Sequence, residues 1–267
     1  MKILPLDKTF DTGTEYKAEH NKFYVFQKLG TNVDVDYIEI EGRRTTPLNS
    51  ELSPQYKTSS NLFGPLDLED LFLVVPPDHR FKFVSSTSGR VVAIGKLGIL
   101  ELGEGLPADL ASRFKNFHLV YKKPFTFTKS LGTDVSWGAG EEVEVVSLTP
   151  TSIERITLND IIGLKAENAG TIGKGDLGVI IYYDDVPLDI LDTTMGRKGI
   201  DFFDMPLPPT SDAMRKPFTF RNFPIVVEPN HTLKIKVINN TGSAITPPSG
   251  TSITITCKFI AKYEIIG

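Results

Sequence analysis

The sequence has very little of what disulfides and metal centres require. Among its 267 residues there is one cysteine, and the four histidines are scattered at His20, His79, His118 and His231. One cysteine excludes an intrachain disulfide framework, and histidines without paired spacing do not form a zinc-ligand pattern. Alternation in "SITITCKFIAKY" places Cys257 on a strand. We expect a buried structural thiol there, because free cysteine usually packs as a small apolar side chain.

Strong charge of one sign and long apolar runs are also missing. The net charge is −4 without an Arg/Lys run, so we expect no nucleic-acid partner. No window approaches the roughly 20 apolar residues of a membrane helix. The N-terminal "MKILPLDKTFDTG" has an apolar patch broken by Pro5, whereas an export signal needs an apolar core of about 7–15 residues. These absences predict a protein made in a cytoplasm and not inserted into a membrane.

The common catalytic motifs are absent. There is no G-x-S-x-G elbow, no Cys/His partnership and no Walker loop. The glycine-rich Ala169–Gly178 segment lacks the Ser or Thr that would follow the lysine of a phosphate loop. Glu142 and Glu144 share a strand face and could begin a glycosidase pair, but such a site also needs sugar-stacking aromatics and Trp137 is the only tryptophan. We expect no enzyme and no cofactor.

The acidic residues cluster in "YYDDVPLDILD", which contains Asp184, Asp185, Asp189 and Asp192. Carboxylate oxygens suit calcium, but no EF-hand spacing accompanies them. We interpret the cluster as a solvated hairpin tip and keep a calcium site as the alternative.

A repeated stretch is the most informative feature of the chain. "VVPPDHRFKF" (Val74–Phe83) returns as "VVEPNHTLKI" (Val226–Ile235) at a constant offset of 152 residues. Each copy reads as an apolar strand stopped by proline, a turn on Asp or Asn, and a second strand. The histidine that follows the turn is interpreted as a corner residue. The alternative is an equivalent binding site in each half.

Short alternating runs separated by Gly, Pro and Asn extend this pattern along the chain. They predict antiparallel sandwiches instead of a parallel α/β sheet. One amphipathic stretch, "GLPADLASRFKNF", has helical spacing and a proline suited to a first helical turn. We therefore predict an all-β protein with two tandem antiparallel β-sandwiches joined by a short helix. The expected segments are an extended N-terminal arm (1–19), a first sandwich (20–104), a helical linker (105–119) and a larger second sandwich (120–267).

The two sandwiches, the corners "VVPPDH" and "VVEPNH", the polar arm and the missing catalytic set together resemble viral virion proteins of the jelly-roll type. This resemblance implies jelly-roll-like domains in a non-enzymatic capsid, decoration or spike subunit of the virion. Such a subunit assembles with copies of itself, often as a trimer, and with other virion proteins. In the adenovirus-type double jelly-roll proteins, two such domains per subunit give the trimer a pseudo-hexagonal outline. By pattern, the first half of this chain holds fewer strands than a full eight-stranded roll.

The candidate assembly residues lie in the long segment Asp192–Lys216. Its apolar content is too high for a segment exposed to solvent, so we expect it to pack against another subunit or across the domain junction. The apolar candidates are Ile200, Phe202, Phe203 and Met205.

A function of a different class is a carbohydrate- or receptor-binding module of a tail or adhesin protein. Such a module would need an exposed aromatic platform that could hold a glycan. The candidates for that platform are Trp137 and the pair Tyr182 and Tyr183.

Overall fold

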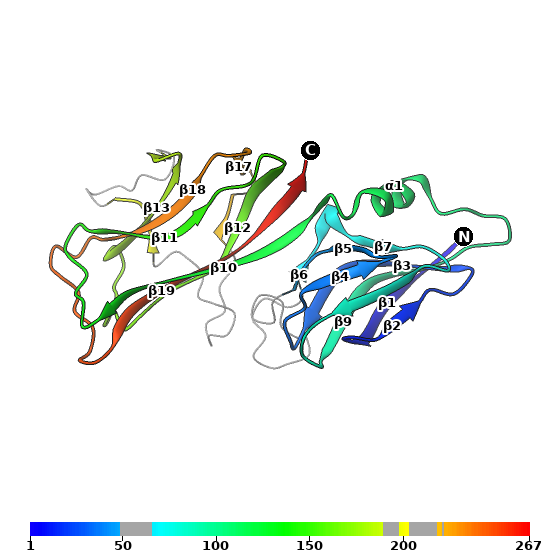
Figure 1. The fold of residues 1–267 in the computed structure, drawn as a ribbon, viewed down its shortest axis with the longest axis horizontal. Helices are drawn as coiled ribbons and strands as arrows, with labels where there is room; N and C mark the ends of the chain where they lie inside the picture. Colours follow the sequence, from blue (N-terminus) through cyan, green and yellow to red (C-terminus); the bar gives the residue numbers. More distant parts are fainter. Residues whose placement is uncertain (49–65, 189–197, 203–217, 221) are drawn as a thin grey trace. The chain divides into compact units, whose positions relative to one another are not determined.

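In the computed structural model, residues 1–48, 66–188, 198–202, 218–220 and 222–267 are described. Nearly all regular structure among them is β-strand (Figure 1). The chain forms two compact units. The first comprises Met1–Pro124 with Lys262–Glu264, and the second comprises Phe125–Ala261 with Ile265–Gly267.

The first half builds two antiparallel sheets. One has the order β1-β9-β3-β6, with β7 also paired to β3, and the other has the order β2-β8-β4-β5. The strands are β1 (Lys2–Asp11), β2 (Glu15–Lys17), β3 (Lys22–Thr31), β4 (Tyr37–Ile40), β5 (Arg43–Thr45), β6 (Leu66–Asp67), β7 (Leu73–Val75), β8 (Arg80–Val84) and β9 (Arg90–Ile99). A short 3-10 turn, η1 (Glu69–Leu71), precedes β7, and α1 (Ala108–Asn116) follows β9.

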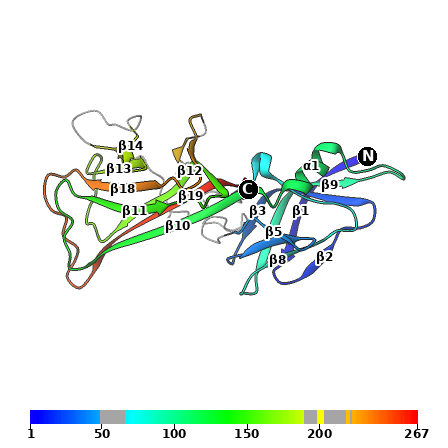
Figure 2. The same ribbon diagram turned by 45° about the horizontal axis from the view of Figure 1, so that its top comes forward.

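The second half builds two further sheets (Figure 2). One has the order β10-β19-β12-β16, with β17 also paired to β12, and the other has the order β11-β18-β13-β14, with β15 also paired to β13. The strands are β10 (Val120–Thr133), β11 (Glu142–Leu148), β12 (Glu154–Glu167), β13 (Leu177–Tyr183), β14 (Val186–Pro187), β15 (Ile200–Asp201), β16 (Phe218–Thr219), β17 (Ile225–Val227), β18 (Leu233–Asn239) and β19 (Ser252–Ile265).

The two halves have the same strand order. In each half, the last strand lies between the first and the third strands in one sheet. In the other sheet, the second strand pairs with the strand that follows the corner. Strands that alternate between two antiparallel sheets in this way form a jelly roll. The all-β, tandem-sandwich prediction is confirmed. The expectation of too few strands in the first half is wrong, since strands β1 to β9 all lie there. Strands β2, β5, β6 and β7 were missed in the sequence because they are too short to show a period of two.

The repeated stretch occupies the same place in both rolls. Each copy is the end of a strand in one sheet, a corner, and the start of a strand in the other sheet. Asp78 and Asn230 both have φ of 64°, a left-handed conformation that Asp and Asn tolerate better than most residues. The amide of the next histidine donates to the carbonyl three residues earlier, at 3.3 Å for His79 and 3.1 Å for His231. The duplication predicted from this repeat is confirmed.

The prediction of a separate N-terminal arm is wrong. Strand β1 pairs with β9 along its whole length, from Lys2 opposite Ile99 to Asp11 opposite Arg90, and β2 pairs with β8. Phe10 is 1% exposed in the core of the first roll. The strand looked irregular in sequence because it lies at a sheet edge, where most of its side chains are exposed and Pro5 is tolerated.

Cys257 is fully buried on β19, and burial raises the pKa of its thiol to about 12. The thiolate is the reactive form of cysteine. We therefore expect a thiol reagent at neutral pH to label native protein far more slowly than protein unfolded in guanidinium, where the thiol regains its ordinary pKa. Absorbance during labelling measures both rates, and equal rates would show that the thiol is accessible in the folded chain.

Candidate interaction surfaces

Two of the predicted assembly residues, Ile200 and Phe202, lie in or directly after β15, which pairs with β13 of the second roll. Ile200 is half-buried in β15 and lies opposite Val179 of β13. Phe202 is 9% exposed. Phe203 and Met205 lie outside the described residues. The contact of this segment with another subunit stays a prediction.

Trp137 is part of the core, and the prediction that it could form an exposed aromatic platform is wrong. Its side chain is 0% exposed, and its indole N–H donates to the Glu141 carbonyl at 2.9 Å. Buried Asn239 donates to the Trp137 carbonyl at 3.0 Å and to the Ser243 carbonyl at 2.8 Å. The Glu141 carbonyl gives the buried indole N–H the partner it needs, and Asn239 ties the backbone at Trp137 to that at Ser243.

The two tyrosines proposed for the platform are engaged by neighbouring side chains. The Tyr182 hydroxyl donates to Glu142 at 2.7 Å, and the Lys236 ammonium lies 4.3 Å from the Tyr182 ring centroid. Burial, assisted by Glu142, raises the pKa of Tyr182 to about 12. Tyr183 stacks on His231 with ring centroids 5.3 Å apart. Neither ring is a free flat surface.

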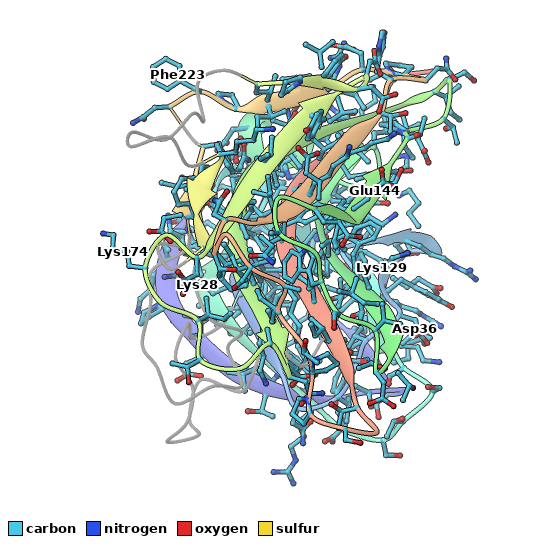
Figure 3. The ribbon with its side chains drawn as sticks, turned by 90° about the vertical axis from the view of Figure 1, so that its left-hand side faces the viewer. Lys28, Asp36, Lys129, Glu144, Lys174 and Phe223 are labelled. Carbon is cyan, nitrogen blue, oxygen red and sulfur yellow. The ribbon has the colours of Figure 1, made fainter. Side chains whose placement is uncertain are left out.

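Paired charges cover the exposed face of the sheet that contains β11, β18 and β13. Lys236 lies 3.5 Å from Glu142, and Lys234 lies 3.6 Å from Glu144 and 2.6 Å from Asp185. Figure 3 labels Glu144 among these side chains. The two glutamates considered for hydrolysis are thus both neutralised by lysines. Such pairing is typical of a solvated strand face and favours no general acid.

The corresponding face of the first roll has the same pattern. Lys82, which corresponds to Lys234 in the repeat, lies between Glu15 and Glu39 in the strand register. Arg80 binds Glu15 at 3.0 Å. Alternating charges of opposite sign on neighbouring strands stabilise each sheet modestly and keep its outer face polar.

The two corner histidines have different surroundings. His79 Nδ1 lies 2.8 Å from the Pro77 carbonyl oxygen, and its ring meets the edge of Phe114 on α1. His231 Nδ1 contacts a carboxylate oxygen of Asp184, and this hydrogen bond is the main cause that lowers the pKa of Asp184. The interpretation as corner residues fits both, whereas one common ligand site does not.

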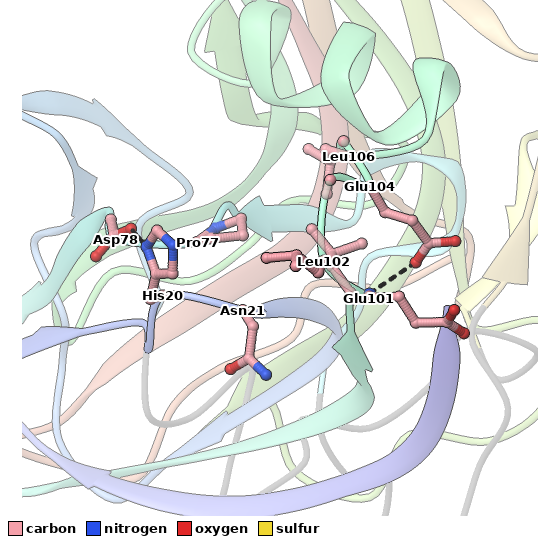
Figure 4. Close-up of a pocket in the computed structure, with 11 residues that line it drawn as sticks. His20, Asn21, Pro77, Asp78, Glu101, Leu102, Glu104 and Leu106 are labelled. Carbon is pink, nitrogen blue, oxygen red and sulfur yellow. Dashed lines mark hydrogen bonds and ion pairs between the residues drawn. The ribbon is translucent and has the colours of Figure 1, made fainter.

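A surface depression of about 440 Å³ lies beside the corner of the first roll (Figure 4). His20 Nδ1 lies 2.6 Å from a carboxylate oxygen of Asp78, and this hydrogen bond is the main cause that lowers the pKa of that carboxyl. On the other side lies the loop after β9, where Leu102 is fully exposed. The depression therefore combines the His20–Asp78 hydrogen bond and the carboxylates of Glu101 and Glu104 with leucine side chains.

Within the described ranges, no three His, Cys, Asp or Glu side chains lie close enough to hold a metal ion. Of the acidic cluster considered for calcium, Asp189 and Asp192 lie outside those ranges. In the same part of the chain, no helix has the length and apolar character needed to span a bilayer.

Helix α1 is fastened to the first roll by an arginine. Arg113 donates three hydrogen bonds to backbone carbonyls, to Phe72 at 2.8 Å, Leu71 at 2.8 Å and Val120 at 3.0 Å. Burial lowers the pKa of its guanidinium to about 10. We did not predict this anchor from the sequence. The available signal was its position three residues after Leu110, on the apolar side of the helix.

Apolar and cation–π contacts complete this docking site, which we call the first helix seat. Leu106 and Leu110 pack on a cluster of Phe23, Val25 and Leu100 on the outer side of β3 and β9. The Arg43 guanidinium, at the β4–β5 hairpin, lies 4.4 Å from the Phe114 ring centroid. The predicted linker (105–119) therefore contains a helix that belongs to the first roll.

No protein-family model matches the chain, and no curated protein matches it in sequence. Among solved structures it matches one titled "PBCV-1 virus capsid, quasi-atomic model", at 10% identity and a TM-score of 0.30. The alignment covers 100% of this chain and 95% of that one. A TM-score this low carries no argument, so the jelly-roll assignment rests on the strand order.

Proposed function

We propose that this protein is a non-enzymatic structural subunit of a virion shell, in a capsid, decoration or spike role, that assembles with copies of itself and with neighbouring shell proteins. One observation carries the proposal: a single chain contains two jelly rolls with the same strand order. Jelly rolls occur in viral capsid proteins and in lectins, and fold alone does not determine function. The proposal therefore also depends on the surfaces.

The described surfaces suit assembly better than catalysis or glycan binding. The carboxylates considered for hydrolysis are paired with lysines, and the aromatics considered for a sugar platform are buried or engaged. Several large apolar side chains are nevertheless exposed, including Leu102 and Phe223. Contiguous exposed apolar groups are a common feature of protein interfaces.

Sedimentation velocity over a wide dilution series tests this function. We expect a symmetric oligomer that dissociates on dilution, because closed point-group symmetry is usual for self-associating subunits. A glycan array under the same buffer conditions is the control for the alternative function. A monomer at every concentration that binds a defined glycan would contradict the proposal and support the carbohydrate-binding alternative.

A further inference from the structure

The surface that α1 covers on the first roll has a counterpart on the second roll, and hydrogen bonds locate it residue by residue. In the first roll the Leu71 amide donates to the Leu68 carbonyl at 2.8 Å. In the second the Phe223 amide donates to the Phe220 carbonyl, also at 2.8 Å. Both pairs are related by the 152-residue offset of the repeat. Phe223 therefore stands where Leu71 stands in the first roll.

The last strand of each roll gives a second correspondence. The Leu100 amide donates to the Asn21 carbonyl at 2.8 Å, and the Ile266 amide donates to the Ile153 carbonyl at 2.9 Å. The hairpin beside the seat gives a third. Glu41 and Asp184 both have φ of 48°, each is followed by one more positive-φ residue, and then by Arg43 or Val186. Val186 thus takes the place of the arginine that stacks on α1.

These equivalent positions differ sharply in exposure. The residues buried at the first helix seat are Leu71 at 5%, Val74 at 0% and Leu100 at 8%. Their counterparts are exposed: Phe223 at 78%, Val226 at 38% and Ile266 at 47%. Figure 3 shows the Phe223 ring standing clear of the ribbon. Two further positions add exposed apolar area, with Ile153 at 50% and Val186 at 64%.

We propose that this surface, which we call the second helix seat, binds an amphipathic helix of a partner polypeptide. It is defined by Ile153, Val186, Phe223, Val226 and Ile266. The occupant is inferred from the first roll, where the equivalent surface is covered by α1 through Leu110 and by Leu106, which lies just before the helix. Among the described residues α1 is the only α-helix, and it already lies on the first seat. Helix α1 is therefore already engaged and is not the occupant of the second seat.

The second seat has polar residues at two positions where the first seat has apolar ones, and this difference indicates which side chains its partner should carry. From the register of β3 with β7 and of β12 with β17, Arg155 corresponds to Phe23 and Thr157 to Val25. Arg155 is paired with Glu228 at 2.9 Å. The partner helix should therefore combine an apolar stripe with a polar or charged side chain that faces this ion pair. The inference rests on the internal duplication and not on the virion role.

A single reactive thiol can test the proposal. Because Cys257 is buried with a raised pKa, the Val226→Cys variant carries one accessible cysteine. The probe is a lactam-bridged peptide of residues 101–119, since a free peptide of this length would be only marginally helical. We expect saturating peptide to slow labelling of Val226→Cys by about tenfold, as expected for a covered interface position. The Leu102→Cys variant, outside the seat, should label at an unchanged rate.

Two results would overturn the proposal. The first is an unchanged labelling rate at Val226→Cys in folded protein, with native circular dichroism and saturating peptide. The second is protection that grows with protein concentration without peptide, which would identify a second copy as the occupant. A peptide with serine in place of Leu106 and Leu110 is the matched control and should give no protection. Sedimentation of the same samples separates failure of helix binding from failure of self-assembly.

Discussion

Replacing Phe10 with alanine is expected to lower the free energy of unfolding of the first roll by about 3–5 kcal/mol, the usual cost of truncating a buried phenylalanine. The ring is 1% exposed. Its centroid lies 5.0 Å from that of Tyr16, 5.2 Å from that of Phe81 and 5.7 Å from that of Phe83. Alanine would leave a cavity beneath these three rings, which all lie on β2 and β8 of the opposite sheet. The effect would be small if residues 1–19 were only a docked arm.

Denaturant unfolding followed by two signals measures this effect. Trp137 is the only tryptophan and lies in the second roll, so its fluorescence reports that roll, while circular dichroism reports both. We expect the Phe10→Ala transition to move to lower denaturant in circular dichroism. The matched control is Phe223→Ala, which removes an exposed ring and should change stability by well under 1 kcal/mol. Equal effects of the two substitutions would contradict the placement of β1.

Replacing Gly95 with alanine is expected to destabilise the first roll by about 3 kcal/mol or more, at the upper end of overpacking effects. A Cβ at this position would lie 1.9 Å from the Val25 carbonyl oxygen and 3.0 Å from the Gln27 nitrogen. Both contacts are backbone atoms, so no side chain can rotate away. The neighbouring register shift between Phe26 and Lys28 brings the two strands into this close approach. The clash can be relieved only by breaking the β3–β9 pairing.

The matched control for this prediction is Gly105→Ala. No heavy atom lies within 4 Å of a Cβ at Gly105, so its replacement should leave stability nearly unchanged. Denaturant midpoints of the two variants, with hydrogen exchange of the β3 amides, provide the measurement. Wild-type exchange protection of β3 in the Gly95→Ala variant would show that the strands do not approach as closely as described.

Much of the fold could be predicted from short stretches of the sequence. Proline followed by Asp78 or Asn230 specified the two corners, because proline ends a ladder and Asp or Asn accepts a left-handed turn. Alternation around Cys257 specified a strand with the thiol inward. The constant offset of the repeat indicated two domains of one plan. These features depend on neighbours in the chain, so the sequence alone was sufficient to determine them.

Other features depended on contacts between distant parts of the chain, and only the tertiary structure decided them. Strand β1 is polar in sequence and became recognisable as a strand only through its pairing with β9. Trp137 looked like a binding residue in sequence, but its side chain is buried in the core and its indole N–H is bound by the Glu141 carbonyl. Val74 and Val226 have the same place in the repeat, yet Val74 is buried where α1 packs on the first roll and Val226 is 38% exposed. Burial is a property of what packs against a residue, and that information lies elsewhere in the chain.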